Sequence, residues 1–155
     1  MDSDPGTYSI VNGGRELLNR IAPLWHELRQ HHADLAPRWR ESQLSKTFEQ
    51  RQSELVSKSG TGLLVSLAVS GGAEIGYCVS TISADGQGEV DSLFVLPSAR
   101  KRGVGSALLA EAMRWFDSRS VQAIAVEVIA GNNAAIEFYS RYGFSPRTVR
   151  LLVYR

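Results

Sequence analysis

One stretch of the sequence combines positive charge with glycine at the start of a predicted helix. Residues 100–102 are all cations, Gly103 and Gly105 follow them, and helical periodicity begins near Val104. Glycines let the backbone turn tightly with its N–H groups facing one side. A helix N-terminus adds about half a positive charge at the same place. The stretch therefore predicts a binding site for a phosphate-bearing cofactor.

Two common phosphate motifs fit this loop poorly. A dinucleotide fingerprint needs a small residue three positions after the second glycine, but Leu108 is there. It also needs an acidic residue at the end of the following strand, and none lies at the expected distance. A Walker loop needs Gly-Lys followed by Ser or Thr, which is absent. The loop alone leaves the cofactor open.

Composition limits the class of protein. The chain has 155 residues, of which 43% are hydrophobic, so we expect a single domain over residues 1–155. Its net charge of +1 gives no reason to expect nucleic acid or a membrane as partner. One cysteine excludes an internal disulfide and the usual structural zinc sites, and we expect no metal cofactor.

The sequence also predicts where the protein resides. No apolar run approaches the roughly 18 residues of a membrane span. The opening Met1-Asp-Ser-Asp-Pro-Gly lacks the basic start and apolar run of a secretory signal. We therefore expect a cytoplasmic protein.

The first half of the chain predicts one strand, two helices and three further strands. A kink or break is expected at Pro23, because an interior proline costs a helix about 3 kcal/mol. Gly-rich turns separate the three later strands, which should pair antiparallel. The predicted ranges are a strand at 7–11, helices at 15–33 and 41–58, and strands at 63–69, 73–82 and 89–96.

The second half predicts a parallel crossover and a final strand. A helix from Val104 to about Ser118 leads to a buried strand at 123–129, and Asn132-Asn133 can cap a helix at 134–142 that stops at Gly143. Residues 148–154 read as a last strand. The order β-α-α-β-β-β-α-β-α-β describes an α/β fold with a mixed, mostly antiparallel sheet of about six to seven strands flanked by helices.

The loop and its surroundings resemble the GNAT superfamily of acyl-CoA-dependent N-acetyltransferases. Arg100-x-x-Gly103-x-Gly105 is similar to that superfamily's pyrophosphate loop, Val95-x-Pro97 to the end of its fourth strand, and the Asn132 to Phe144 stretch to its last motif. These matches cover about 60 residues, and the element order covers nearly the whole chain. Two motifs in the right order around a strand are more specific than a lone glycine loop.

The resemblance implies a binding site for acetyl-CoA. Its pantetheine chain would lie against the strand at 93–95, and its pyrophosphate against the backbone N–H groups of about 102–106, with cations near the phosphates. Asn132 matches a cofactor-contacting asparagine, although helix capping explains it equally well and one amide could do both. The implied residues are Leu93, Phe94, Val95, Arg100, Lys101, Arg102, Gly103, Val104, Gly105, Ser106, Asn132 and Tyr139.

Acetyl transfer to an amine needs a base. Only a neutral amine can attack the thioester, and a lysine-like amine is only about 0.04% neutral at pH 7. Its deprotonation at that pH costs roughly 4.6 kcal/mol of free energy. Glu89 lies where some superfamily members carry a catalytic glutamate, and Asp91 should share its face of the strand. A water relay, or a merely solvated Glu89, is the alternative.

The resemblance also implies an oxyanion donor and an acid. The backbone N–H of Val95 would hold the tetrahedral oxyanion. Tyr139 matches the superfamily's general acid, and a phenol with its ordinary pKa near 10 is protonated at pH 7. The alternative for Tyr139 is core packing, as for its neighbour Phe138.

The acceptor amine is not identified by the sequence. His31 and His32 belong to a region that lines the acceptor side in the superfamily, and Trp39 could touch the acceptor. Adjacent histidines point in different directions on a helix, which argues against a metal site. Cys78 reads as a small buried hydrophobe.

Three questions remain open at the level of sequence. A non-catalytic acyl-CoA-binding or sensing domain would keep the loop but lack the acid and base, so Tyr139 and Glu89 favour the enzyme. Transfer of longer acyl groups depends on the room beside the thioester. The superfamily's frequent dimers allow a homodimer, but the sequence does not identify an interface.

Overall fold

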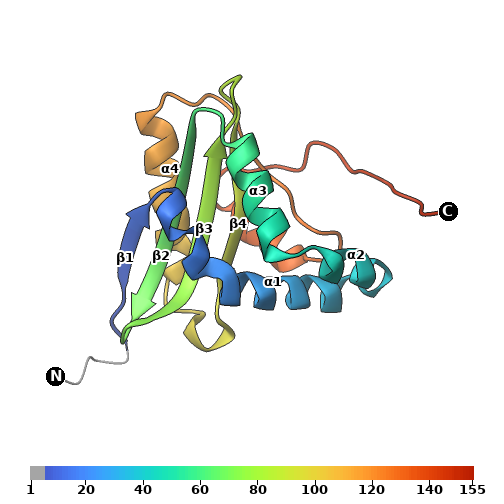
Figure 1. Ribbon diagram of the computed structural model, residues 1–155, viewed down its shortest axis with the longest axis horizontal. Helices are drawn as coiled ribbons and strands as arrows, with labels where there is room; N and C mark the ends of the chain where they lie inside the picture. The colour runs from blue at the N-terminus through green and yellow to red at the C-terminus, as the bar shows by residue number, and fades with distance from the viewer. Residues whose placement is uncertain (1–5) are drawn as a thin grey trace.

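The computed structural model describes residues 6–155. Most of the opening segment used to judge a secretory signal lies outside this range. Within it, one five-stranded sheet has the order β1-β2-β3-β4-β5, with β1 to β4 antiparallel and β5 parallel to β4 (Figure 1). The strands are β1 (Ser9–Gly13), β2 (Gly62–Ser70), β3 (Ala73–Ile82), β4 (Gly88–Val95) and β5 (Ile124–Val126).

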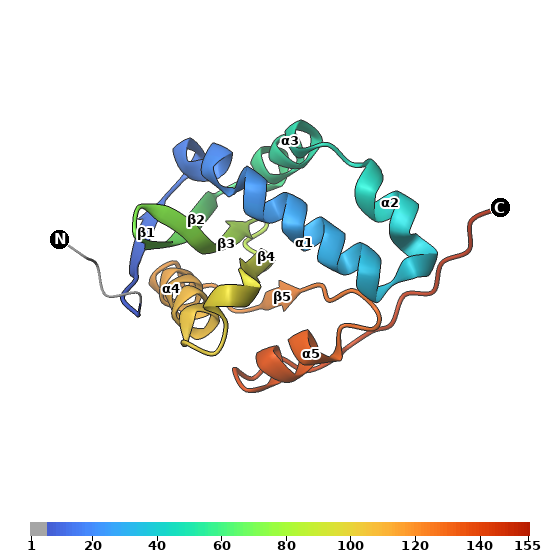
Figure 2. The same ribbon diagram turned by 90° about the horizontal axis from the view of Figure 1, so that it is seen from below.

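Helices cover both faces of the sheet. One face packs against the early helices, and the other against α4 and α5 (Figure 2), so apolar residues form a core on each side. None of these helices in residues 6–155 is long and apolar enough to cross a membrane. The helical elements are the 3₁₀ segments η1 (Arg15–Ile21), η2 (Pro37–Trp39) and η3 (Pro97–Ala99), and the α-helices α1 (Ala22–Leu35), α2 (Arg40–Ser45), α3 (Phe48–Lys58), α4 (Val104–Ser118) and α5 (Asn133–Ser140).

Both predicted early helices are interrupted. Pro23 lies in the first turn of α1, directly after η1, which confirms the expected break. The helix expected at 41–58 is two helices, because Lys46 is extended and Thr47 starts α3 with a capping box. Thr47 Oγ1 accepts from the Gln50 N–H at 3.1 Å, and Thr47 N–H donates to Gln50 Oε1 at 2.8 Å.

Strand β4 contains a bulge at Asp91. Val79 pairs with Ser92 and Ser80 with Val90, so Asp91 is the extra residue. Strict alternation back from Phe94, which packs in the core under α1, would turn Asp91 toward α4. The bulge instead turns Asp91 toward α3, where it shares a face with Glu89, as predicted.

Strand β5 pairs with β4 over only three residues. The paired positions end at Val90 and Val126, although a strand was expected at 123–129. Past this point β4 continues from its bulge to Val95 without a neighbour on that side. The two strands therefore separate and leave an opening between them, as expected for an acyl-CoA site.

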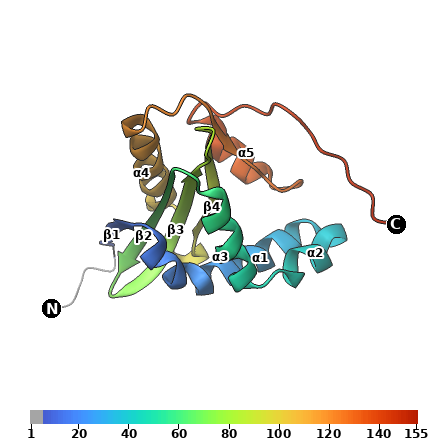
Figure 3. The ribbon, with the colours of Figure 1, turned by 45° about the horizontal axis from the view of Figure 1, so that its top comes forward.

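The predicted last strand at 148–154 is wrong. Residues 145–155, here called the arm, run extended away from α5 with no strand pairing and end beside α2 (Figures 1 and 3). The β-branched pattern is real, but a strand also needs a backbone partner, and the arm reaches none. The sheet therefore has five strands in the described residues, and not the six to seven expected.

Candidate active site

A groove of about 640 Å³ lies where β4 and β5 separate. All the predicted cofactor-binding residues except Arg102 line it, from Leu93 on β4 to Tyr139 on α5. We call residues 100–106 its loop end. Its carboxylate end is the group Lys58, Thr81, Glu89 and Asp91, of which Asp91 lines the groove.

The loop end is shaped by two left-handed residues. Lys101 has φ +64° and Gly103 has φ +75°, and Gly103 is the N-cap of α4. The N–H groups of the first helical residues have no partner within the helix, so they point out of its N-terminus. A Cβ on Gly105 would make only ordinary contacts, at 3.7 Å from the Phe138 ring. Backbone conformation thus requires Gly103, whereas protein packing does not require Gly105.

The three loop cations differ in position. Arg100 Nε donates to the Val95 carbonyl at 3.0 Å, and its guanidinium lies 5.6 Å from the centroid of the Phe94 ring. Arg100 therefore ties the loop to the end of β4. Lys101 is exposed and lines the groove, while Arg102 does not line it. Arg102 Nη2 is buried without a hydrogen-bond partner among residues 6–155.

The Val95 backbone faces the groove. Leu96 N–H donates to the Ile75 carbonyl at 2.9 Å, across the β3–β4 ladder. Since successive residues of a ladder point to opposite edges, the N–H and C=O of Val95 point away from β3. The bond from Arg100 to the Val95 carbonyl lies on that same edge. A donor is thus present where an oxyanion was predicted.

Tyr139 is packed in the core and also lines the groove. Its side chain is buried, with 7% exposed, and its ring lies 5.1 Å from Phe138 and 5.5 Å from Phe144, between centroids. Burial raises the pKa of its phenol, so the hydroxyl is protonated near neutral pH.

Asn132 caps helix α5 at the edge of the groove. Its Oδ1 accepts a hydrogen bond from Ala135 N–H at 3.2 Å, which confirms the predicted helix cap. The residue also lines the groove. One side of the amide is therefore committed to the helix, while Nδ2 remains a donor for another group.

The carboxylate end is organised by Lys58, which the sequence analysis missed. Its Nζ lies 2.5 Å from both Glu89 Oε2 and Asp91 Oδ1. Thr81 Oγ1 donates to the other Asp91 oxygen at 2.7 Å. Lys58 lies more than 30 positions from both carboxylates and belongs to no local motif, so no sequence signal marked it.

Burial dominates the electrostatics of Asp91. Its side chain is fully buried, and burial raises the pKa of its carboxyl even though hydrogen bonds from Lys58 and Thr81 act to lower it. Burial acts to lower the pKa of Lys58, but the hydrogen bonds and charges of Asp91 and Glu89 outweigh it and the pKa is raised. Glu89 is part of this cluster but does not line the groove.

Helix α1 supplies the wall opposite α5. His31 and His32 both line the groove, together with Leu28, which the sequence had not singled out. Burial, and then the charges of His31 and Arg29, lower the pKa of His32 to about 4, so it is neutral near pH 7. Within residues 6–155, no three potential metal ligands cluster together.

Cys78 is a core residue, as predicted. It is buried in the core under α4, and burial raises the pKa of its thiol to about 12. It therefore lacks the thiolate character of a nucleophile.

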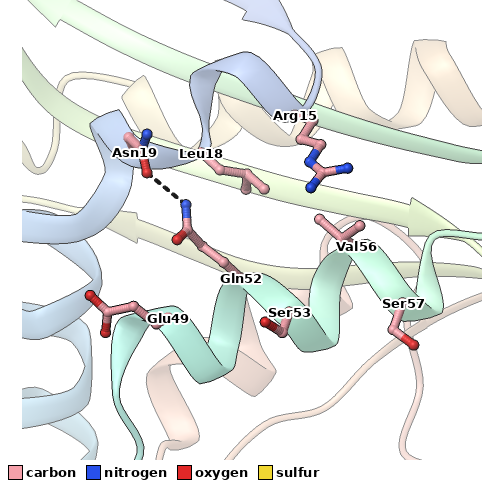
Figure 4. A pocket seen from close by; sticks show the side chains of 8 residues that line it. All are labelled: Arg15, Leu18, Asn19, Glu49, Gln52, Ser53, Val56 and Ser57. Carbon is pink, nitrogen blue, oxygen red and sulfur yellow. Dashed lines mark hydrogen bonds between the residues drawn. The ribbon is translucent and has the colours of Figure 1, made fainter.

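A second cavity, of about 610 Å³, lies between η1 and α3 (Figure 4). Gln52 Nε2 donates to Asn19 Oδ1 at 2.7 Å across it. Arg15 and Glu49 are its charged residues, and none of the predicted site residues lines it. The groove, which holds the predicted site residues, is therefore the candidate active site.

The antiparallel sheet thus opens beside its one parallel strand, with a glycine loop at the opening, as the resemblance to the GNAT superfamily implied. The family model described as "Acetyltransferase (GNAT) family" matches residues 25–144. The chain therefore belongs to the GNAT acetyltransferase family.

Known proteins support the family and the fold. The chain is 35% identical over 71 residues to an uncharacterized N-acetyltransferase of Methanocaldococcus jannaschii, covering 46% of this chain and 31% of that one. It is 30% identical over 97 residues to aminoglycoside N(6')-acetyltransferase type 1 of Salmonella typhimurium, covering 57% and 66%. These alignments thus span from about a third to just under two thirds of the relatives' lengths.

A solved structure supports the fold over a longer range. The PaiA N-acetyltransferase of Thermoplasma acidophilum, in complex with coenzyme A, superposes with a TM-score of 0.70. The two chains are 20% identical, and the match covers 93% of each. At this identity, the likeness establishes the fold alone.

Proposed function

We propose that this protein is an N-acetyltransferase that transfers the acetyl group of acetyl-CoA to a primary amine by direct attack in a ternary complex. The observation that carries the proposal is the single groove that joins the loop end, the N–H of Val95, and Tyr139. The coenzyme A in the Thermoplasma structure and the amine acceptor in the name of the Salmonella relative support the same activity.

The loop end fits a pyrophosphate. The left-handed Gly103 and the start of α4 present backbone N–H groups at a helix N-terminus, and Lys101 lines the same part of the groove. Without a Cβ at Gly105, phosphate oxygens could approach the backbone closely. Arg100, held on the Val95 carbonyl, would contribute charge from the floor of the groove.

The open edge of β4 fits pantetheine. Leu93 and Val95 lie on the side where β5 has turned away. The backbone groups of Leu93 would pair with an amide chain much as a neighbouring strand does. Asn132 would add a side-chain amide. The Val95 N–H would then hold the oxyanion formed on the thioester carbonyl.

In the proposed reaction, the neutral amine nitrogen attacks the thioester carbon. A C–N bond forms, the C–S bond breaks, and the amine loses one proton to a base. Tyr139 would donate its proton to the departing thiolate and recover one from solvent. Burial raises the pKa of Tyr139, which keeps the hydroxyl protonated at neutral pH but makes it a weaker proton donor, so the acid role in this proposal rests on the position of Tyr139 in the groove.

The base in this proposal is the Glu89–Asp91 pair, with Glu89 as the final proton acceptor. Glu89 does not line the groove, whereas Asp91 does. A proton leaving the amine would therefore reach Glu89 through Asp91, Lys58 or a bridging water. A raised pKa brings the Asp91 carboxyl closer to the working pH of a base.

A screen of amines with acetyl-CoA tests this function. Release of free coenzyme A thiol would be followed for amino acids, polyamines, aminoglycosides and peptides with free N-termini. We expect thiol release with at least one class. Tight coenzyme A binding by calorimetry without turnover on any class would instead support a sensing domain, and absence of binding would refute both functions.

A further inference from the structure

A bond between two hydroxyl groups joins the end of α5 to the loop end of the groove. The Tyr142 hydroxyl donates to Ser106 Oγ at 2.5 Å, across 36 positions of the sequence. Ser106 belongs to the first turn of α4 and lines the groove, whereas Tyr142 does not line it. Tyr142 has no part in the proposed reaction, yet its hydroxyl contacts one of the residues expected to hold the phosphates of the cofactor.

The direction of this bond decides what the Ser106 hydroxyl can do. A serine hydroxyl has one proton to donate and two lone pairs with which to accept, and a phenol with pKa near 10 is the better donor of the pair. Because Ser106 Oγ accepts the Tyr142 proton, the proton of Ser106 is directed to another partner. No other hydrogen bond of this hydroxyl is found among residues 6–155. Its proton is therefore available to an acceptor in the groove.

The Ser106 hydroxyl lies where an anion is expected. Ala107 N–H is the first in α4 to bond within the helix, to the Gly103 carbonyl at 3.0 Å, so the N–H groups before it are left for a ligand. Ser106 thus offers a backbone N–H and a side-chain O–H at the same helix N-terminus. A hydrogen bond to an anion is roughly twice as strong as one between neutral groups. A donor that itself accepts a hydrogen bond is polarised further.

The packing around the two hydroxyls does not depend on their bond. The Tyr142 ring lies 5.3 Å from the Phe138 ring, between centroids, and the Phe138 ring would lie 3.7 Å from a Cβ on Gly105. Apolar contact therefore holds this part of the chain against the start of α4. A phenylalanine in place of Tyr142 would keep that contact and remove only the hydroxyl.

We propose that Tyr142 is a positioning residue of the cofactor site, whose hydroxyl commits the Ser106 proton to a phosphate oxygen of coenzyme A. This inference rests on the proposed function, because it needs coenzyme A at the loop end. Tyr142 itself does not contact the phosphate, and it acts only through Ser106. Its effect belongs to binding of the pyrophosphate and not to the proton transfers at the carboxylate end.

Calorimetric titration with coenzyme A tests this role and needs no acceptor amine. Tyr142→Phe should raise Kd about fourfold and Ser106→Ala about tenfold, since the second change removes a hydrogen bond to a charged group. The double variant should bind no more weakly than Ser106→Ala, because Tyr142 then has no hydroxyl to position. If Tyr142→Phe weakens binding equally with and without Ser106, then Tyr142 contacts the phosphate directly and the inference is overturned.

Two comparisons separate positioning from a structural role. Tyr8→Phe removes a hydroxyl that donates to the Gly103 carbonyl at 3.4 Å, so its effect on Kd should be the same with and without Ser106→Ala. Pantetheine, which lacks the pyrophosphate, should bind equally to Tyr142→Phe and to the unmodified chain.

One result assigns the bond to stability instead. If Tyr142→Phe melts at a lower temperature but binds coenzyme A as the unmodified chain does, the bond is a structural tie and the inference is overturned. Absence of coenzyme A binding by the unmodified chain would refute the proposed function, and this inference with it, before any variant is compared.

Discussion

The two ends of the groove are held together over very different distances in the sequence. At the loop end, Ala107 N–H bonds to the Gly103 carbonyl, and Arg100 reaches back five positions to Val95. At the carboxylate end, Lys58 crosses 31 and 33 positions to reach Glu89 and Asp91. The loop end is thus a local structure that a motif can encode, and the carboxylate end exists only after α3 packs on the sheet.

The same comparison separates two functions of the groove. Backbone N–H groups and cations at the loop end suit an anion that is bound and released unchanged. Buried carboxylates at the other end suit proton transfer. If this division is correct, changes at the carboxylate end should lower kcat, and changes at the loop end should raise KM for acetyl-CoA. Three kinetic predictions test this division on an amine found active in the screen, and a fourth concerns the stability of the groove wall.

The largest effect is expected at Asp91. Asp91→Asn should lower kcat roughly a thousandfold while coenzyme A binding stays nearly unchanged, because the groove loses its buried carboxylate. Glu89→Gln should lower kcat by a comparable factor, because Glu89 is the final proton acceptor of the same relay. Asp85→Asn, on the exposed turn between β3 and β4, is the control for the same chemical change. Equal losses at Asp91 and Asp85 would contradict a role in proton transfer.

Tyr139→Phe should lower kcat about a hundredfold, since the leaving thiolate would lose its acid while the ring still packs against Phe138 and Phe144. Steady-state kinetics would be compared with Tyr154→Phe, which removes a hydroxyl from the exposed arm. If instead Tyr139→Phe only lowers the melting temperature and leaves kcat intact, the residue has a packing role alone.

Gly103→Ala should raise KM for acetyl-CoA about tenfold, because a Cβ at φ +75° costs roughly 1 kcal/mol and distorts the start of α4. Gly143→Ala, at φ +89° after α5, strains the backbone in the same way outside the groove. Chemical denaturation should show similar stability losses in both variants. A KM change shared by both would mean that strain, and not the anion cradle, explains it.

The smallest effect is expected from His32, and it appears in stability. Because the folded state lowers its pKa from 6.5 to about 4, the unfolded chain binds a proton more readily, and stability falls as the pH drops from about 6.5 toward 4. The loss is at most about 3 kcal/mol and is reduced by solvent screening at this half-buried site. Denaturation of His32→Gln at pH 7 and pH 4.5 should show a smaller acid-induced loss than the unmodified chain. An equal loss would place the acid sensitivity elsewhere.

Local patterns in the sequence predicted much of the fold. Alternation and turn residues located β2, β3 and β4 to within one residue, and glycine and proline located the ends of α1 and α5. The cap at Asn132 and the left-handed Gly143 were also predicted. Such features depend on neighbours in the chain, so they can be read without knowing the tertiary contacts.

Long-range contacts decided the features of the fold and the site that the sequence did not predict. The bulge that turns Asp91 toward α3 depends on the register between β3 and β4. Lys58 joins the carboxylates only because α3 lies over that face of the sheet. The segment at 148–154 has the pattern of a strand but no partner in its own chain, since a strand is stabilised by a second backbone and a pattern cannot provide one.

The sequence by itself determined the class of this protein and the loop end of its groove. Those features follow from residues within a few positions of each other, such as Gly103 and Gly105, where backbone conformation and helix start are set locally. Tertiary structure alone decided which side chains meet at the carboxylate end and that the arm is left unpaired. The physical reason is that packing between distant segments decides which side chains are buried. Packing buries Asp91, which raises the pKa of its carboxyl, and it leaves Leu151 exposed.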